Sequence, residues 1–461
     1  MSEMDFIAGF LEKSLKPYKK SVEEFRTLPE KGVPKEKILG ILSELASAEN
    51  KGWEAGRVSG AVYHGEDELV SFLEKVFAIY SQCNPLHVDI WPSVVKLDTE
   101  IVAMCSSVMH GDGHVRGSVT SGGTESILLA MKAYRDFYRK KKGIVHPRVI
   151  LPKSAHVAFS KACDYFEIEP VYVDLNEDFQ VDVEKVNEAI TPDTIALVGS
   201  APCYPFGTYD PIEALSDIAK TKGIGLHVDG CLGGFITPWA KRVGYDVPEA
   251  NFQTPGVTSI SMDTHKYGFG PKGTSVILYR GSELFQHHLY VATNWQGGIY
   301  FTPTMAGSRP GFPLAAAWAV MLMMGDKGYL ESAKKILDTG DYIKKQVSGI
   351  DGLKVLGKPL HVIAIASDRF DPYLVLEGMS RKKWMLSGLM NPPAFHIHLT
   401  LRHTKEGVKE AFIRDLKLSA EEVAKGKIES APLAPIYGLS SALPKADVEM
   451  FMKNIVEWLY S

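Results

Sequence analysis

Short apolar runs alternate with helical segments through the middle of the chain, and this alternation most limits the fold. Between residues 61 and 325 we expect strands at 149–151, 170–174, 195–198, 225–229, 259–262 and 274–279, and helices at 125–142, 155–166 and 211–222. Apolar strands joined by helices are typical of a mostly parallel sheet that is covered on both faces. The pattern predicts an α/β fold with ligands bound beyond the carboxyl ends of the strands.

The segments on either side of this region have a different character. Residues 1–60 are polar and helical in pattern, with breaks at Pro29 and Pro34, and we expect an N-terminal helical arm. Residues 61–325 are expected to form one large domain. Residues 326–461 combine expected helices (329–348 and 445–460) with expected short strands (353–356, 362–365 and 396–401), which predicts a smaller C-terminal α+β domain.

Charge and cysteine content exclude several classes of protein. The formal net charge is −4, and the one dense basic run, residues 139–142, ends an expected helix, where cations are favoured. We therefore expect no nucleic-acid partner. The five cysteines form no C-x-x-C pair, so a zinc-finger site is not expected and no metal is assigned. So few cysteines in a long chain indicate a reduced, intracellular protein.

No segment has the pattern of a membrane anchor or a secretory signal. The longest apolar run, residues 314–324, is too short to span the ~30 Å hydrocarbon core of a bilayer as a helix. The first residues lack the basic stretch of a signal peptide. We therefore expect a soluble, cytoplasmic protein without a transmembrane segment.

Three segments suit ligand chemistry, and each also has an ordinary structural interpretation. Residues 121–125 (SGGTE) open the long helix with two glycines and a threonine, as in a phosphate cradle or a simple glycine turn. Asp229 ends an apolar strand, where it either faces a ligand or stabilises a turn. Lys266 follows another strand beside aromatic residues and glycines, and is either a nucleophilic amine or a surface lysine.

Together the three segments fit one cofactor, pyridoxal 5'-phosphate. The cradle would hold the phosphate, Asp229 would pair with the pyridinium nitrogen, and Lys266, 37 residues later, would carry the aldehyde as a Schiff base. His156, soon after the strand at 149–151, supplies an aromatic ring for the face of the cofactor. The combination predicts a pyridoxal-phosphate enzyme.

The chain resembles the sphingosine 1-phosphate lyases, in the group II decarboxylase branch of the fold-type-I pyridoxal-phosphate enzymes. The resemblance runs from about Tyr63 to the C-terminus, on the segments NPLH (84–87), VTSGGTES (119–126), HVDGCLGGF (227–235), DTHKYG (263–268), PKG (271–273), WQGGIY (295–300) and AGSRPG (306–311). The last two are more particular to the lyases, whereas the His–Lys and strand-end Asp signals are shared with amino-acid decarboxylases. The resemblance implies a fold-type-I transferase-like fold.

The resemblance also implies an activity and an assembly. The implied enzyme is a carbon–carbon lyase that cleaves phosphorylated sphingoid bases by a retro-aldol reaction to a long-chain aldehyde and phosphoethanolamine. An amino-acid decarboxylase of the glutamate or aromatic type is the alternative, and a non-catalytic protein on the same fold is a second one. The family is a homodimer with shared active sites. Its eukaryotic members carry a membrane anchor, which we do not expect here.

Individual roles follow from the same resemblance. The residues implied to bind the cofactor are Lys266 as the Schiff-base lysine, Asp229 at the pyridinium nitrogen and His156 on the ring face. Gly123, Thr124 and His265 are implied to bind its phosphate, together with Ser308 of the partner subunit. The residues implied to receive the substrate phosphate are Asn84, His87 and Lys272. The implied active-site tyrosines are Tyr204 and Tyr63, with Tyr63 of the partner subunit as the second candidate for proton transfer at the substrate hydroxyl.

Some supporting residues also have structural interpretations. Asn84 and His87 suit a turn after a helix. The two tyrosines suit packing in a core. His396 and His398 alternate on an expected strand, and we interpret them as structural.

Overall fold

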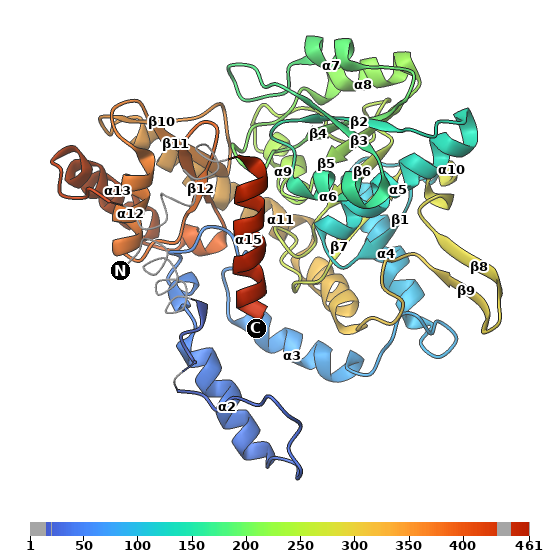
Figure 1. Ribbon diagram of the computed structural model, residues 1–461, viewed down its shortest axis with the longest axis horizontal. Coiled ribbons are helices and arrows are strands. Elements are labelled where there is room, and N and C mark those ends of the chain that lie inside the picture. The colour runs from blue at the N-terminus through green and yellow to red at the C-terminus, as the bar shows by residue number, and fades with distance from the viewer. Residues whose placement is uncertain (1–14, 20, 431–443, 461) are drawn as a thin grey trace.

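A seven-stranded sheet forms the larger of two lobes in the computed structural model, which describes residues 15–19, 21–430 and 444–460 (Figure 1). Its strands are β1 (Arg116–Thr120), β2 (Arg148–Pro152), β3 (Glu169–Val173), β4 (Thr194–Ser200), β5 (Gly225–Asp229), β6 (Ser259–Met262) and β7 (Ser275–Tyr279). Their order is β1-β7-β6-β5-β4-β2-β3. The pairs from β6 to β3 are parallel, and β7 is antiparallel to β1 and β6. The predicted α/β fold with a mostly parallel sheet is confirmed.

Helices cover both faces of this sheet. Successive side chains of a strand point to opposite faces, and in strands such as β2 both sets are apolar and need to be buried. In β2, Val149 and Leu151 join the core under α5 (Gly123–Lys142) and α6 (Val157–Phe166). Ile150, between them, joins the core under α4 (Ser93–Val108) and α8 (Ile212–Lys222) on the other face. Strands that are buried on both faces leave their carboxyl edge as the place where polar loops meet.

The smaller lobe is built on an antiparallel sheet of order β10-β11-β13-β12. Its elements are β10 (Leu353–Val355), β11 (Val362–Ser367), α12 (Pro372–Arg381), β12 (Ser387–Leu389), β13 (Ala394–His398), the 3-10 helix η2 (Leu401–Thr404) and α13 (Val408–Ala424). The long helix α11 (Phe312–Val347) precedes this lobe in the chain and bends at Gly325, where φ is +54°. The expected helix at 329–348 is the second half of α11.

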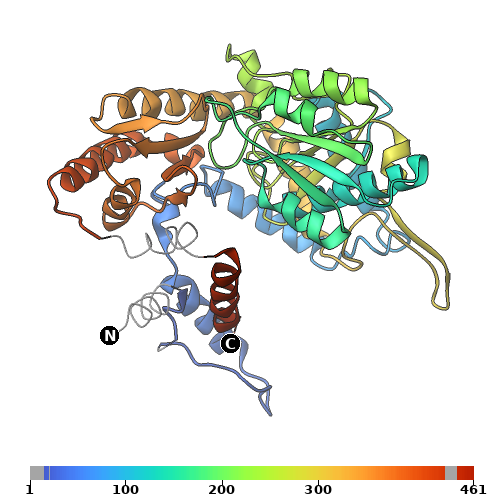
Figure 2. The same ribbon diagram turned by 45° about the horizontal axis from the view of Figure 1, so that its top comes forward.

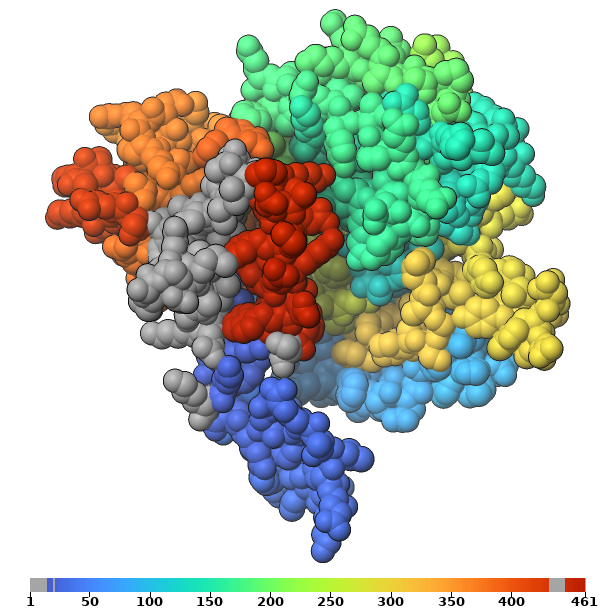
Figure 3. All heavy atoms as spheres, viewed as in Figure 1, coloured from blue at the N-terminus to red at the C-terminus, as the bar shows by residue number. Residues whose placement is uncertain are grey.

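Several elements lie outside the two sheets and their covering helices. They are α2 (Lys35–Ala48), the 3-10 helix η1 (Lys51–Trp53), α3 (Glu68–Tyr80), α7 (Val183–Ala189), α9 (Thr237–Arg242), α10 (Ser282–Gln286), the hairpin of β8 (Tyr290–Trp295) and β9 (Gly298–Thr302), and α15 (Lys445–Tyr460). Helix α2 projects from the body and buries no residue, and α15 lies near it (Figure 2). In the view of Figure 3, α15 is seen between the two lobes. Among the described residues, no helix combines the length and apolarity needed to cross a bilayer.

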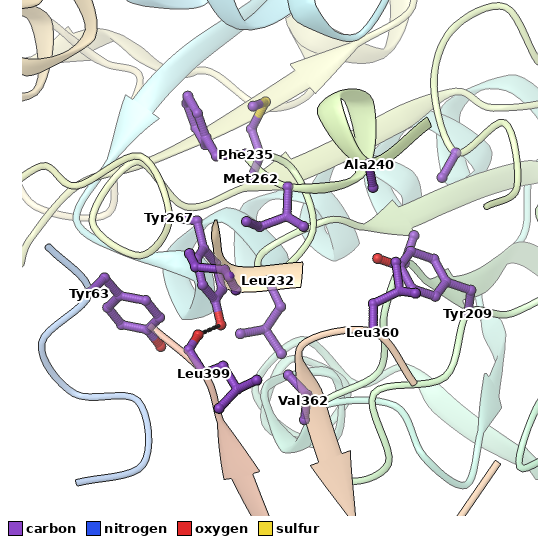
Figure 4. Close-up of a cluster of buried hydrophobic side chains, with 14 of the residues drawn as sticks. Tyr63, Tyr209, Leu232, Phe235, Ala240, Met262, Tyr267, Leu360, Val362 and Leu399 are labelled. Carbon is purple, nitrogen blue, oxygen red and sulfur yellow. Dashed lines mark hydrogen bonds between the residues drawn. The ribbon is translucent and has the colours of Figure 1, made fainter. Parts of the chain in front are cut away.

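A shared apolar core joins the lobes next to the carboxyl edge of the large sheet (Figure 4). The hydroxyl of Tyr267 donates a hydrogen bond to the carbonyl of Leu399, which follows β13, at 2.8 Å. The ring of Tyr63 packs edge-on against Tyr267, with 4.9 Å between the ring centroids. Leu232 and Val362 belong to the same core. This packing holds β13 of the small lobe beside the loop that follows β6.

Candidate active site

Loops that follow four neighbouring parallel strands meet at the carboxyl edge of the large sheet. The loop after β2 carries His156, the loop after β4 carries Tyr204, β5 ends at Asp229, and the loop after β6 carries Lys266. Burial lowers the pKa of the His156 imidazole, and the charges of Asp229 and Lys266 act on it in opposite directions. The structure therefore brings these four predicted residues together.

A buried ion pair fixes Lys266. Its Nζ lies 2.9 Å from Oδ2 of Asp263, whose side chain is 1% exposed. Burial alone would lower the pKa of Lys266, but the Asp263 carboxylate and nearby groups outweigh burial and raise this pKa. Burial alone would raise the pKa of Asp263, and the Lys266 charge lowers it instead. Lys266 is thus a cation here, and its partner is Asp263.

Asp229 is held separately from this pair. One carboxylate oxygen of Asp229 accepts a hydrogen bond from the backbone N–H of Cys231 at 3.0 Å. The same oxygen accepts one from the hydroxyl of Ser261 at 3.4 Å. Asp229 is buried, and the two donors hold its carboxylate in place. A buried carboxylate at a strand end suits a cationic ring nitrogen in a ligand.

The N-terminus of α5 is open toward His265. Gly122 has φ of +156° and ψ of 168°, and no side chain caps the helix. The ring of His265 lies 3.5 Å from where a Cβ on Gly122 would be, and its Nδ1 has no hydrogen-bond partner among the described residues. A Cβ on Gly123 would lie 2.8 Å from Oδ1 of Asp263. These glycines, with the exposed Thr124 in the same turn, suit a bound phosphate.

Glu125 connects this turn to the loop that carries Ser308. Its carboxylate accepts hydrogen bonds at 2.6 Å from the backbone N–H groups of Ser121 and Met305. Glu125 is buried in the first turn of α5, where the positive end of the helix dipole stabilises a carboxylate. The glycine turn and the 302–309 loop are therefore fixed to each other.

Tyr204 lies among three histidine rings. Its ring centroid is 5.8 Å from that of His156, 5.1 Å from that of His396 and 4.8 Å from that of His398. His396 and His398 come from β13 in the small lobe and are buried. The Lys266 charge contributes to lowering the pKa of His398, after burial and the nearby histidines. The small lobe therefore contributes two side chains at this edge of the site.

Tyr63 and Lys272 form another part of the site. The ammonium of Lys272 lies 4.6 Å from the ring centroid of Tyr63. Burial raises the pKa of Tyr63 to about 12, and the charges of Lys266 and Asp263 act on it. Burial and the Lys266 charge lower the pKa of Lys272 to about 8. Tyr63 was expected to come from a partner subunit, but the structure places Tyr63 of the same chain beside Lys272.

Asn84 and His87 are located elsewhere, in the connection between α3 and α4. The amide of Asn84 donates a hydrogen bond to Oγ of Ser308 at 3.1 Å. The ring of His87 contacts Trp91, with centroids 6.4 Å apart. In the described part of the chain, no hydrogen bond or ring contact joins Asn84, His87 or Ser308 to Lys266 or Lys272. The predicted residues thus form two groups.

Sequence reasoning missed some of the residues that shape this site. Asp263 was seen only as part of a motif, although its position three residues before Lys266 was a signal for an ion pair. His396 and His398 were interpreted as structural, because nothing local to β13 indicates that it lies beside the loop after β4. Among the described residues, no group of three or more potential ligands could hold a metal ion.

We predict that replacing the buried carboxylate destabilises the protein. In cofactor-free protein, Asp263→Asn leaves the Lys266 cation unpaired and should lower the free energy of unfolding by about 3 kcal/mol, the low end for a buried pair because Lys266 keeps some exposure. Adding Lys266→Met should restore part of the loss. Asp338→Asn, in the exposed pair with Lys334, is the control and should cost less than about 1 kcal/mol. Urea denaturation measures all three, and equal losses for the two aspartates would contradict a buried pair.

Comparisons with known proteins agree with this geometry. The family profile described as "Pyridoxal-dependent decarboxylase conserved domain" matches residues 25–361. A sphingosine-1-phosphate lyase of Drosophila melanogaster is 43% identical over 92% of this chain and 78% of that protein. Sphingosine-1-phosphate lyase 1 of Mus musculus is 41% identical over 90% of this chain and 74% of that protein.

Solved structures extend the comparison to the fold. A sphingosine-1-phosphate lyase of Burkholderia pseudomallei is 42% identical, with a TM-score of 0.87, over 90% of this chain and 97% of that chain. A glutamate decarboxylase of Lactobacillus brevis, 19% identical with a TM-score of 0.75 over 88% of this chain and 96% of that chain, shares the fold. The chain therefore belongs to the sphingosine-1-phosphate lyase family, within the pyridoxal-dependent decarboxylase group.

Proposed function

We propose that this chain is a pyridoxal-phosphate-dependent lyase that cleaves phosphorylated sphingoid bases to a long-chain aldehyde and phosphoethanolamine. One observation carries the proposal: Lys266, Asp229, His156 and the open end of α5 meet at one sheet edge, in a chain 38–43% identical over most of its length to sphingosine-1-phosphate lyases. A decarboxylase with the same fold remains the alternative, and the glutamate decarboxylase of Lactobacillus brevis is only 19% identical to this chain.

The residues at this edge fit pyridoxal 5'-phosphate. Nδ1 of His265 is buried without a hydrogen-bond partner among the described residues, which is costly unless a ligand satisfies it. Gly123, Thr124 and His265 would hold the phosphate, and Asp229 would pair with the ring nitrogen. His156 would cover the ring face, and Lys266 would bind the aldehyde. Bound there, the cofactor supplies an electron sink for the bond that breaks beside the substrate amine.

The chain's own residues then have to orient the substrate. Lys272 carries a positive charge beside the cofactor set, and it suits the substrate phosphate. Binding the phosphate, which takes no part in the bond cleavage, uses remote binding energy to hold the reacting bond in one orientation. Asn84 and His87 would complete this phosphate site from the partner subunit.

A proton must leave the substrate hydroxyl when the carbon–carbon bond breaks, and a proton must reach the carbon that keeps the amine. Tyr204 and Tyr63 are the candidate groups, because both lie near Lys266 and each carries a hydroxyl that can donate and accept. The net reaction moves the hydroxyl proton to carbon, so it needs no external acid or base.

Replacing the lysine tests the proposed chemistry. Lys266→Ala should abolish both aldehyde release and the near-visible absorbance of bound cofactor, because no amine remains to hold the cofactor aldehyde. Absorbance spectra and an aldehyde assay measure the two losses. Lys334→Ala, an exposed lysine on α11, is the control and should keep both. Native aldehyde release by Lys266→Ala would contradict the assignment.

Replacing Lys272 tests the substrate phosphate site. Lys272→Gln should raise KM for sphingosine 1-phosphate ~10-fold or more and change the binding of unphosphorylated sphingosine much less. Lys272 is charged only below its lowered pKa, so competition by phosphoethanolamine should weaken between about pH 7 and about pH 9 in the wild type. In Lys272→Gln this pH dependence should be absent. Equal losses for both ligands would argue against a phosphate site.

A homodimer with shared sites explains why the predicted residues form two groups. The hairpin of β8 and β9 exposes Tyr290, Trp295, Ile299 and Phe301, and a cavity of about 1220 Å³ lies between the hairpin and α4. Exposed apolar surface of this kind marks a protein interface. A second copy on this face would place Asn84, His87 and Ser308 of one subunit in the site of the other.

Mixing two inactive variants tests shared sites. Lys266→Ala and His87→Ala subunits should each have little activity alone. If sites are shared, refolding an equal mixture should restore up to about a quarter of wild-type activity, because half of the dimers are mixed and each has one intact site. Aldehyde release after co-refolding, with each variant refolded alone as the control, measures the recovery. No recovery in dimers shown to be mixed would mean that each subunit completes its own site.

We also propose a reducing location such as the cytoplasm, because the five cysteines are free and buried. Cell fractionation tests this proposal, and an exclusively extracellular protein would contradict it.

A further inference from the structure

Two buried histidines lie beside Tyr204, and each leaves one ring nitrogen without a hydrogen-bond partner among the described residues. His396 is 0% exposed and His398 is 3% exposed, on a strand whose neighbours are apolar. Nδ1 of His396 is hydrogen-bonded to the carbonyl oxygen of Pro205 at 2.9 Å, but Nε2 of both rings lacks a partner among the described residues. A buried polar nitrogen without a hydrogen-bond partner is unfavourable, so packing alone would favour an apolar residue at these positions.

The geometry around Tyr204 gives these rings a use. The His396 and His398 rings touch each other, with 4.4 Å between their centroids, and both touch the Tyr204 ring. His156 contacts Tyr204 as well. Tyr204 is 41% exposed, so part of its side chain is open to a ligand, and the rest of its ring packs against the histidines. A partly exposed tyrosine without these contacts would sample several rotamers, and its hydroxyl would not be held at one position relative to the substrate.

Tyr63 has a different setting. It is 7% exposed, its ring packs against Tyr267, and the Lys272 ammonium lies over the ring. No imidazole ring contacts Tyr63 among the described residues. Its ring therefore serves the lobe contact and the placement of Lys272. Among the described residues, the aromatic rings that contact Tyr204 are those of three histidines.

We propose that His398, supported by His396, is a positioning residue that fixes the phenol of Tyr204 and so makes Tyr204, rather than Tyr63, the group that receives the proton of the substrate hydroxyl. This inference rests on the proposed function. The unpartnered Nε2 of His398 is then the hydrogen-bonding atom available to the Tyr204 hydroxyl. The transfer needs no new co-reactant. Oη of Tyr204 accepts the substrate proton as its own hydroxyl proton moves to Nε2 of His398. When Tyr204 later gives a proton to carbon, His398 returns the proton to Tyr204.

A double-mutant cycle tests this coupling in the cofactor-loaded enzyme. Tyr204→Phe should lower kcat ~100-fold, and His398→Phe, which keeps the ring but removes the nitrogen, should lower kcat ~10-fold with little change in KM. If His398 acts through Tyr204, the double variant should be no slower than Tyr204→Phe alone. In a Tyr63→Phe background, His398→Phe should keep its full effect. His398→Gln, which restores a polar group, should recover part of kcat.

The controls separate a positioning role from a structural one. His361 is also buried, and neither of its ring nitrogens has a hydrogen-bond partner in the described part of the chain. It packs against Tyr267, so His361→Phe should combine additively with Tyr204→Phe. If His398→Phe loses the cofactor absorbance, the same cycle is run with His398→Asn. If the wild type releases aldehyde and the losses for His398→Phe and Tyr204→Phe are additive in the double variant, the inference is overturned. A wild type that releases no aldehyde would instead overturn the proposed function.

Discussion

The ion pair between Lys266 and Asp263 fixes the centre around which the rest of the site is arranged. A buried ammonium is stable only beside an anion, so the carboxylate determines where Lys266 lies. The next residue, Tyr267, is hydrogen-bonded to Leu399 in the small lobe. One short segment after β6 therefore places the reactive amine and also holds β13 against the large lobe. The histidines of β13 reach Tyr204 as a consequence.

Different groups in the site suit the phosphate of the cofactor and the phosphate of the substrate. The open end of α5 and His265 suit one phosphate, and Lys272 suits another. These two groups are neighbours, because the ammonium of Lys272 donates a hydrogen bond to the carbonyl of His265 at 3.3 Å. Lys266 and the two tyrosines lie at the same edge of the sheet. Anion-binding groups and tyrosine hydroxyls around one amine fit a substrate with a phosphate and a hydroxyl beside its amine. An amino-acid decarboxylase would need a group for a substrate carboxylate instead.

The sequence predicted those parts of the fold and site that depend on local pattern. The expected strands at 225–229 and 259–262 coincide with β5 and β6, because continuous apolar runs mark buried strands. Asp229 was found because it ends the first of these runs, and Lys266 because it lies in the loop after the second. Strand β1 was missed, since its residues, RGSVT, are mostly small or polar although three of them are buried. The β8–β9 hairpin was missed as well.

Parts of the site that depend on tertiary contact were not visible in the sequence. His398 lies almost 200 residues beyond Tyr204 in the chain, and only the packing of the small lobe brings the rings together. The placement of Tyr63 beside Lys272 in the same chain has the same origin. The grouping of Asn84 with Ser308 likewise needed the fold, since 224 residues separate them.

The geometry of this site is suited to cleave a phosphorylated sphingoid base. Incubation of the cofactor-loaded protein with sphingosine 1-phosphate, followed by analysis of both products, tests this activity. We expect a long-chain aldehyde and phosphoethanolamine in equal amounts, with no carbon dioxide from glutamate or aromatic amino acids. Release of carbon dioxide from those amino acids, with no aldehyde from sphingosine 1-phosphate, would contradict this expectation.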